Sequence, residues 1–170
     1  MIAQKSSHPA GLLGDLPARI AVTGAAGFLG RQLTNRLAAA REVETIVAID
    51  WAAMPEQAKV VVVRRDIRDG VGDVLADHGI QAIVHLAYVV RPVRDRRLAR
   101  SINVGATEAL LAACSSAGTT KIVYSSSTTV YGAHADTDGH WFTEADNPRP
   151  LKGFQYSENK VTAENLIRRW

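Results

Sequence analysis

The sequence of 170 residues contains a single cysteine, Cys114, and therefore cannot form a disulfide within the chain. It also lacks an apolar run of the roughly 18 residues that a membrane span requires. Its first 19 residues include Lys5, Pro9, Asp15 and Pro17, and this interrupted pattern does not resemble a signal peptide. These absences exclude a secreted disulfide scaffold and favour a cytoplasmic protein with no membrane partner.

An excess of one charge is also missing. The chain has 20 Lys and Arg residues against 17 Asp and Glu, which gives a net charge of +3. So small an excess does not indicate a nucleic-acid partner. Apolar residues make up 46% of the sequence and charged residues 22%, a composition typical of one globular domain rather than a disordered chain.

Short apolar runs alternate with segments of helical periodicity from residue 19 onward. The runs predict buried strands at residues 20–22, 45–49, 60–63, 82–86 and 122–125. Apolar spacings of three and four predict helices over residues 28–40, 69–78, 94–117 and 156–170, with Gly79 and Gly118 ending two of them. Strands that are apolar throughout and alternate with helices predict a doubly wound α/β fold around a parallel sheet.

A glycine-rich turn joins the first predicted strand to the first predicted helix. In Thr23-Gly24-Ala25-Ala26-Gly27-Phe28-Leu29-Gly30, Gly24 allows a sharp turn and Gly30 allows the helix to lie close to the strand. Gly27 has no side chain that would keep a pyrophosphate from the backbone, and the start of the helix attracts phosphates. The candidate cofactor-binding residues are Gly24, Ala26, Gly27, Phe28 and Leu29. The alternative is a tight turn without a ligand.

Asp50 ends the second predicted strand, 20 residues after Gly30. A carboxylate at this spacing can accept hydrogen bonds from both hydroxyls of an adenosine ribose. It would repel a 2′-phosphate, and no Arg follows directly in Asp50-Trp51-Ala52-Ala53. The pattern therefore favours NAD over NADP, with a solvated strand-end acid as the alternative.

Tyr156 and Lys160 are spaced i and i+4 and would share one face of the last predicted helix. The ammonium can lower the pKa of the phenol and can hold a cofactor ribose. A phenol tuned in this way is a credible acid/base for a carbinol proton. Ser127, at the end of the fifth predicted strand, can donate to the same substrate oxygen. These three residues are the candidate catalytic site, and a plain surface Tyr–Lys pair is the alternative.

The chain resembles the short-chain dehydrogenase/reductase superfamily and, within it, the extended NAD-dependent epimerase/dehydratase family. The resemblance rests on motifs in family order from residue 19 to the end of the chain, namely Thr23-Gly24-xx-Gly27-xx-Gly30, Asp50, Asp66-Ile67, His85-Leu86-Ala87, Asn103-Val104, the run from Ser125 to Gly132, and Tyr156-xxx-Lys160. It implies a Rossmann-type sheet with NAD as cofactor.

The resemblance also implies roles for residues outside the glycine turn. Asp66 and Ile67 would flank the adenine, and Leu86 and Ala87 would line the cofactor path. Asn103 would support the active site, and Ser125 would contact the cofactor. Tyr156 would be the acid/base, with Lys160 as its modulator and a ribose ligand.

Four departures from the family pattern affect the interpretation. Tyr88 stands where a small residue is common, and Ala106 replaces the usual Gly. Ser127-Thr128-Thr129 lacks the acid pair of 4,6-dehydratases, which favours an epimerase or a simple dehydrogenase. The family continues well past the Tyr–Lys helix, so residues 19–170 are interpreted as the NAD-binding part, preceded by an extension over residues 1–18 and lacking the substrate-binding part.

The expected function is that of an NAD-dependent epimerase or oxidoreductase acting on a secondary alcohol of a small molecule, with a nucleotide sugar favoured. A non-catalytic dinucleotide-binding module and an inactive truncated fragment are the alternatives. No metal is predicted, although His134, Asp136, Asp138 and His140 lie close in sequence. The resemblance implies a homodimer through the two helices that flank the fifth strand, where Ala106, Ala109, Leu110 and Ala113 would form a small-residue face.

Overall fold

A single parallel sheet organises the chain. The computed structural model describes residues 16–89 and 95–170, so most of the predicted N-terminal extension and residue Arg94 lie outside the described residues. Five strands pair in the order β3-β2-β1-β4-β5, all parallel. They are β1 (Arg19–Thr23), β2 (Thr45–Asp50), β3 (Val60–Arg64), β4 (Ala82–His85) and β5 (Lys121–Tyr124). The predicted doubly wound α/β fold is confirmed.

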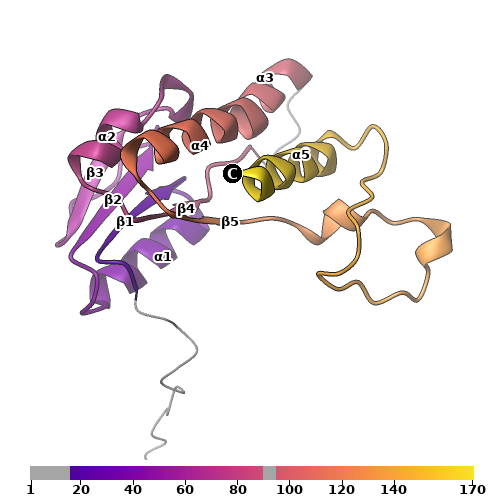
Figure 1. Cartoon of the computed structure of the whole chain (residues 1–170), viewed down its shortest axis with the longest axis horizontal. Helices are drawn as coiled ribbons and strands as arrows, with labels where there is room; N and C mark the ends of the chain where they lie inside the picture. Colours follow the sequence, from indigo (N-terminus) through magenta and orange to yellow (C-terminus); the bar gives the residue numbers. More distant parts are fainter. Residues whose placement is uncertain (1–15, 90–94) are drawn as a thin grey trace, which may run out of the picture.

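Helices cover both faces of the sheet (Figure 1). α1 (Phe28–Ala39) lies on one face, and α2 (Gly72–Asp77) and α4 (Ala106–Ala117) lie on the other. α5 (Gln155–Arg169) packs beside α4. None of the helices in the described part of the chain is long and apolar enough to cross a membrane.

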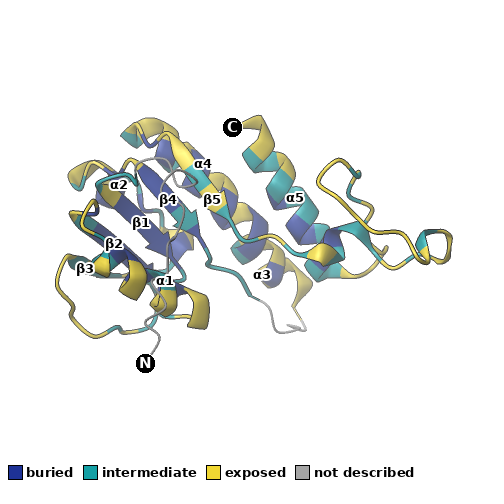
Figure 2. Cartoon of the chain, turned by 90° about the horizontal axis from the view of Figure 1, so that it is seen from below, coloured by how far each residue is buried: buried dark blue, intermediate teal, exposed yellow. Residues whose placement is uncertain are grey.

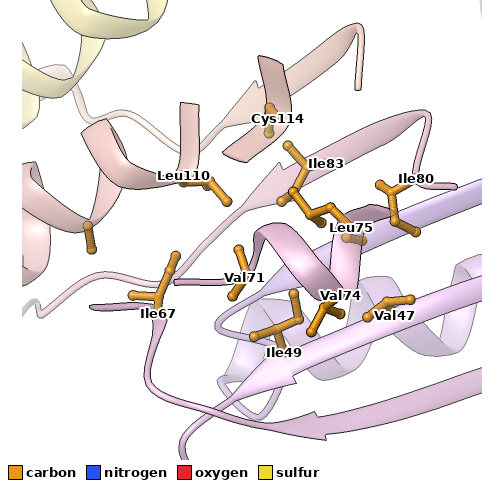
Figure 3. Close-up of a cluster of buried hydrophobic side chains, with 12 residues drawn as sticks. Val47, Ile49, Ile67, Val71, Val74, Leu75, Ile80, Ile83, Leu110 and Cys114 are labelled. Atoms are coloured by element: carbon orange, nitrogen blue, oxygen red, sulfur yellow. The ribbon is translucent and has the colours of Figure 1, made fainter. Parts of the chain in front are cut away.

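The core forms two apolar clusters, one on each face of the sheet, because side chains of a strand alternate between faces. On one face, Val22 and Ile46 pack against Leu37 of α1. On the other, strand residues pack against α2 and α4, as Figure 3 shows for Ile83, Leu75 and Leu110. Cys114 is fully buried in this second cluster, and burial raises the pKa of its thiol to about 11. The central strands are the most deeply buried part of the chain (Figure 2).

The predicted helix over residues 69–78 is wrong over its first three residues. Asp66 caps a short 3-10 helix, η1 (Ile67–Asp69), by accepting a hydrogen bond from the backbone N–H of Arg68. Gly70 then has φ +79°, which interrupts the helical backbone before α2 begins at Gly72. The inward-facing residues Val71, Val74 and Leu75 are nevertheless buried, as their spacing predicted.

The predicted helix over residues 94–117 is continuous but not uniform. It consists of α3 (Arg96–Arg100), a π-helical turn η2 (Ser101–Gly105) and α4. Gly118 ends it in the left-handed conformation, with φ +73°. The wider turn alters the direction of the side chains that follow it, a feature that apolar spacing alone does not reveal.

β5 forms one edge of the sheet and leads away from it. Val123 lies beside Val84 in the pairing register, and its side chain is 52% exposed. After β5 the chain forms η3 (Thr128–Tyr131) and η4 (Ala135–Thr137) in a segment that projects from the sheet and returns to α5 (Figure 1).

Candidate active site

A cavity with a volume of about 690 Å³ opens at the carboxyl ends of β1, β2 and β4. β1 and β4 are neighbours in the sheet but not in sequence, so the strand order reverses here, where open parallel sheets bind ligands. Eight of the candidate cofactor-binding residues line this cavity: Gly24, Ala26, Gly27, Asp50, Asp66, Ile67, Leu86 and Ala87.

The glycine turn is shaped by two positions that exclude a side chain. Gly24 has φ +70°, and a Cβ atom there would lie 2.6 Å from the backbone nitrogen of Ala87. A Cβ atom on Gly30 would collide with the carbonyl oxygen of Gly24 and would lie 2.6 Å from Cα of Ala25. The first glycine therefore lets β1 turn beside the segment after β4, and the second brings α1 against the turn.

The start of α1 faces the turn without a side-chain cap. Gly27 is the N-cap residue, and no side chain accepts a hydrogen bond from the first helical N–H groups. These N–H groups have no partner within a helix, so a helix start of this kind favours an anion. The side chains of Phe28 and Leu29 are exposed, so these two residues offer the site their backbone rather than their side chains.

Asp50 connects the end of β2 to the glycine turn. Its Oδ2 accepts a hydrogen bond from the backbone N–H of Ala26 at 3.0 Å, and its Oδ1 accepts one from Ala52 at 2.9 Å. Each carboxylate oxygen can accept more than one hydrogen bond, so both can still bind hydroxyl donors. Arg64 lies opposite Asp50 in the β2–β3 register and donates from Nε to the carbonyl oxygen of Trp51 at 3.1 Å.

The segment after β3 forms a further part of the cavity wall. Ile67 is buried, and the Asp66 carboxylate pairs with the guanidinium of Arg68 at 2.7 Å. The hydrogen bond from Arg68 holds the pKa of Asp66 below its usual value. Arg65 also lines the cavity and pairs with Asp73 at 2.6 Å. The predicted pair Asp66-Ile67 thus lies between two arginines that the sequence interpretation did not consider.

His85 connects the end of β1 to η2 and α4. Its Nδ1 lies 2.7 Å from Oγ1 of Thr23, and its Nε2 lies 3.0 Å from Oγ1 of Thr107. The Thr107 hydroxyl donates to the carbonyl oxygen of Asn103, so it can accept a hydrogen bond from Nε2–H. A neutral ring that accepts from Thr23 satisfies both contacts. Burial, and secondarily the charge of Lys160, lowers the pKa of His85 to about 4.

Asn103, within η2, holds the segment after β4 through two hydrogen bonds. Its Oδ1 accepts from the backbone N–H of Val89 at 2.8 Å, and its Nδ2 donates to the Val89 carbonyl at 3.3 Å. Val89 lines the cavity, whereas the Asn103 side chain is buried behind it. Asn103 thus supports the cavity wall from behind.

The three serines after β5 have different partners. The carbonyl oxygen of Ser125 accepts a hydrogen bond from Lys160, and the Ser126 hydroxyl donates to Glu164. The Ser127 oxygen caps η3 and accepts from the Thr129 hydroxyl at 3.0 Å. Because Ser127 accepts in both of these interactions with Thr129, its own hydroxyl proton is free to be donated.

Lys160 lies buried among three tyrosine rings, only 3% exposed. Its Nζ donates to the Ser125 carbonyl at 2.6 Å and lies 3.6, 4.6 and 5.9 Å from the ring centroids of Tyr88, Tyr124 and Tyr156. Burial lowers the pKa of Lys160 to about 8. The helical spacing of Tyr156 and Lys160 therefore brings both side chains to the end of the sheet near β5.

The polar segment after η3 pairs its charged groups with each other. Asp136 pairs with Arg149 at 2.5 Å, and His140 contacts Asp146 at 3.1 Å. Within residues 16–89 and 95–170, no three His, Cys, Asp or Glu side chains gather as a metal site would require.

The candidate residues thus gather in two adjoining groups. One surrounds the cavity, and the other comprises Tyr156, Lys160 and the serine run at the β5–α5 end of the sheet. Tyr88 belongs to both groups, because it lines the cavity and contacts α5. The sequence interpretation did not include Tyr88 in the site, although its departure from the family pattern could have indicated it. The position of Arg64 opposite Asp50 follows from the pairing register of β2 and β3, which the sequence does not reveal.

Residues 20–170 match the NAD dependent epimerase/dehydratase family. Among curated proteins, the 3 beta-hydroxysteroid dehydrogenase/Delta 5-->4-isomerase of Vaccinia virus (strain Western Reserve) is 33% identical over 159 residues. That alignment covers 86% of this chain and 44% of the viral protein.

Two solved structures are also similar. MoeE5 in complex with UDP-glucuronic acid and NAD is 34% identical, with a TM-score of 0.73, covering 87% of this chain and 48% of that one. UDP-glucuronic acid 4-epimerase from Bacillus cereus in complex with NAD is 26% identical, with a TM-score of 0.75, covering 89% and 51%. The chain thus spans about half the length of these relatives.

Proposed function

The chain belongs to the NAD dependent epimerase/dehydratase family, and from this premise we propose that it binds NAD in the cavity at the ends of β1, β2 and β4. We further propose that Ser127, Tyr156 and Lys160 form the acid/base site of an epimerase or oxidoreductase. The substrate would be a secondary alcohol, with a nucleotide sugar favoured.

The observation that carries the cofactor proposal is the joint position of the glycine turn and Asp50 around one cavity. Gly24 and Gly30 leave no room for a Cβ atom, and α1 begins without a side-chain cap. A pyrophosphate would bind the N–H groups at this helix start, and a ribose would donate its hydroxyls to Asp50. The residues present therefore fit a dinucleotide.

The acid/base proposal rests on the environment of α5. NAD, when bound, accepts a hydride from a carbinol carbon or returns one. Tyr156 would take the hydroxyl proton of the substrate, and Ser127 would donate a hydrogen bond to the same oxygen. Lys160, buried beside Tyr156 and held by the Ser125 carbonyl, would favour the phenolate by its charge.

The choice of substrate is supported by two of the similar proteins. MoeE5 and the Bacillus cereus epimerase were solved with nucleotide sugars, whereas the similar viral protein is a hydroxysteroid dehydrogenase. Both substrate classes can present a secondary alcohol, so the same acid/base chemistry serves either. The two nucleotide-sugar proteins favour that class.

A calorimetric titration with NAD tests the cofactor proposal. We expect saturable binding that Gly27→Ala weakens, because a methyl group at the helix start would hold the pyrophosphate away from the backbone. Its Cβ atom would lie 3.2 Å from the Gly24 carbonyl oxygen, a tight contact that a small backbone shift must relieve, so the melting temperature of the variant is measured beside its NAD affinity. Gly105→Ala is the matched control, since nothing lies within 4 Å of that position. Failure of the unmodified chain to bind NAD would reject the proposal.

A turnover assay separates the enzyme from a binding module. UDP-glucose or UDP-glucuronic acid would be supplied with NAD to a full-length version of the protein that includes a substrate-binding part, and NADH formation and sugar products would be followed. Tyr156→Phe should lower turnover by about 10²–10⁴-fold, the usual contribution of a positioned acid/base, and should change NAD affinity little. Lys160→Met should impair both. A protein that binds NAD but converts neither sugar would support the non-catalytic alternative. If NAD does not change the melting temperature of the chain, the result would support the inactive fragment.

A further inference from the structure

Tyr88 connects the cofactor cavity to α5. It follows Leu86 and Ala87 after β4, and it lines the cavity together with them. Its hydroxyl donates a hydrogen bond to the carbonyl oxygen of Tyr156 at 3.0 Å. This bond joins residues 68 positions apart and attaches the first turn of α5 to the end of β4.

The ring of Tyr88 contacts the side chains of both Tyr156 and Lys160. Nζ of Lys160 lies 3.6 Å from the Tyr88 ring centroid, within the range of a cation–π interaction. The ring of Tyr156 meets Tyr88 edge to face, with centroids 5.4 Å apart and planes at 78°. One side chain thus touches both members of the proposed acid/base pair.

The buried ammonium needs this support. A charge removed from water is costly unless nearby groups compensate for it. No carboxylate among the described residues forms an ion pair with Lys160, because Glu164 instead accepts from Ser126 and pairs with Arg168. The contacts that stabilise the charge are the Ser125 carbonyl and the faces of Tyr88 and Tyr124, and the negative charge of Glu164 adds a Coulombic attraction without an ion pair.

We propose that Tyr88 is a positioning residue, whose ring holds the Lys160 ammonium and whose hydroxyl holds the first turn of α5, so that Lys160 and Tyr156 lie together behind the part of the cavity wall that Tyr88 forms. This inference rests on the proposed function. Tyr88 acts through Lys160 and Tyr156 rather than on the substrate.

Two substitutions separate the ring from the hydroxyl. Tyr88→Phe removes the hydrogen bond to Tyr156 and keeps the ring, whereas Tyr88→Leu removes both. Tyr131→Phe is the matched control, because Tyr131 also donates to a backbone carbonyl, that of Thr143 at 3.1 Å, away from Lys160. A pentafluorophenylalanine at position 88 keeps the outline of Phe but reverses the charge of the ring face, so it removes the attraction for the ammonium without a cavity.

The first measurement is the proton shift of the lysine ε-methylene groups in chain labelled with ¹³C-lysine. The chain has five lysines, and Lys160→Met assigns the signal of interest. The protons of a methylene group that lies over an aromatic face have a displaced chemical shift. We expect Tyr88→Phe and Tyr131→Phe to retain this displacement, and Tyr88→Leu to lose most of it.

The second measurement is NAD affinity by calorimetry. We expect Tyr88→Phe to weaken binding about 3-fold and Tyr88→Leu about 10-fold, in line with the ordinary strength of one hydrogen bond and one cation–π contact. The fluorinated ring should bind NAD more weakly than the Tyr88→Phe chain. Tyr131→Phe should bind as the unmodified chain does.

Opposite results would overturn the inference. An unchanged Lys160 signal in Tyr88→Leu would do so, as would equal NAD affinity for the Phe and fluorinated chains. A loss of melting temperature in all Tyr88 variants without a change at Lys160 would mark a purely structural role. If no chain binds NAD, the proposed function fails, while the Lys160 signal still decides the role of Tyr88.

Discussion

The backbone N–H of Ala26 donates a hydrogen bond to Oδ2 of Asp50 at 3.0 Å. This bond joins the glycine turn after β1 to the end of β2, so the acid that would bind the ribose also holds the turn that would bind the pyrophosphate. The two halves of a dinucleotide site are therefore mechanically connected. A change at Asp50 should affect both the choice of cofactor and the shape of the turn.

We predict that NAD binds well ahead of NADP, and that Asp50→Ala narrows this gap because it removes the charge that repels a 2′-phosphate. Asp50→Asn separates the two roles of the side chain. It removes the charge but keeps an oxygen that can accept from Ala26, so it should narrow the gap with a smaller loss of stability than Asp50→Ala. Calorimetric titration of all three chains with both cofactors is the test, and equal affinities in the unmodified chain would contradict the prediction.

Gly24→Ala should destabilise the fold more than Gly118→Ala does. Both glycines have a positive φ, +70° at Gly24 and +73° at Gly118. An alanine in that left-handed conformation costs roughly 1–2 kcal/mol. At Gly118 nothing lies within 4 Å of the added atom, whereas at Gly24 it would lie 2.6 Å from the Ala87 nitrogen. Urea unfolding of both variants measures the difference, and equal losses would show that the crowding at Gly24 is unimportant.

The stability of the fold should fall as the pH is lowered from about 6.5 to 4. The pKa of His85 is about 4 in the folded chain, below its ordinary value of 6.5, because the ring is buried. Between these values the unfolded chain binds a proton that the folded chain does not, which amounts to about 3 kcal/mol over the whole interval.

Unfolding free energies measured across this range, with His85→Gln as the comparison, test the prediction. The variant should be less stable at neutral pH but should lose less stability on acidification. The carboxylates Asp66, Asp73, Asp136 and Asp146 have lowered pKa values, so their contributions are lost at more acidic pH. An unchanged slope in His85→Gln would exclude His85 as the cause.

The homodimer through α4 and α5 stays a prediction, but most of the residues expected to form its contact surface are buried in the core. Ala106 and Leu110 are buried, and Ala113 packs against the core, so of the four expected residues only Ala109 is exposed. The exposed small residues of α4 are Ala109, Ala112, Ser115 and Ser116. Ala109→Arg should convert a dimer to a monomer in light scattering, whereas Gln32→Arg on exposed α1 should not. A monomeric unmodified chain at tens of micromolar would contradict the prediction.

The sheet could be predicted from the sequence because its central strands β1, β2 and β4 are largely buried on both faces, while β3 and β5 are also short runs rich in apolar residues. Apolar runs such as residues 46–49 have no polar positions that could mimic the pattern of a helix, and the five predicted strands agree with the observed ones to within a residue or two. The helix over residues 69–78 could not be predicted in full. Its interruption depends on Gly70, whose positive φ no apolar pattern reports.

The candidate site also has parts that the sequence predicts and parts that it does not. The glycine turn and Asp50 are local motifs with fixed spacing, and both line one cavity. The neighbours of Lys160 are set by contacts between distant segments, among them the hydrogen bond from Tyr88 to Tyr156. Likewise, Asn103 lies in the π-helical turn η2, and its side chain is hydrogen-bonded to the backbone of Val89 in the segment after β4. Such long-range contacts leave no periodic signal in the sequence.

The order of the strands has a consequence for hydrogen exchange. β1 is paired on both sides, whereas β5 is paired with β4 and forms an edge. Amide protons of a central strand are released only by large openings of the sheet, and those of an edge strand by small ones. We therefore expect slow amide exchange in β1, to which the glycine turn is attached, and faster exchange in β5, which leads to the serine run near Lys160.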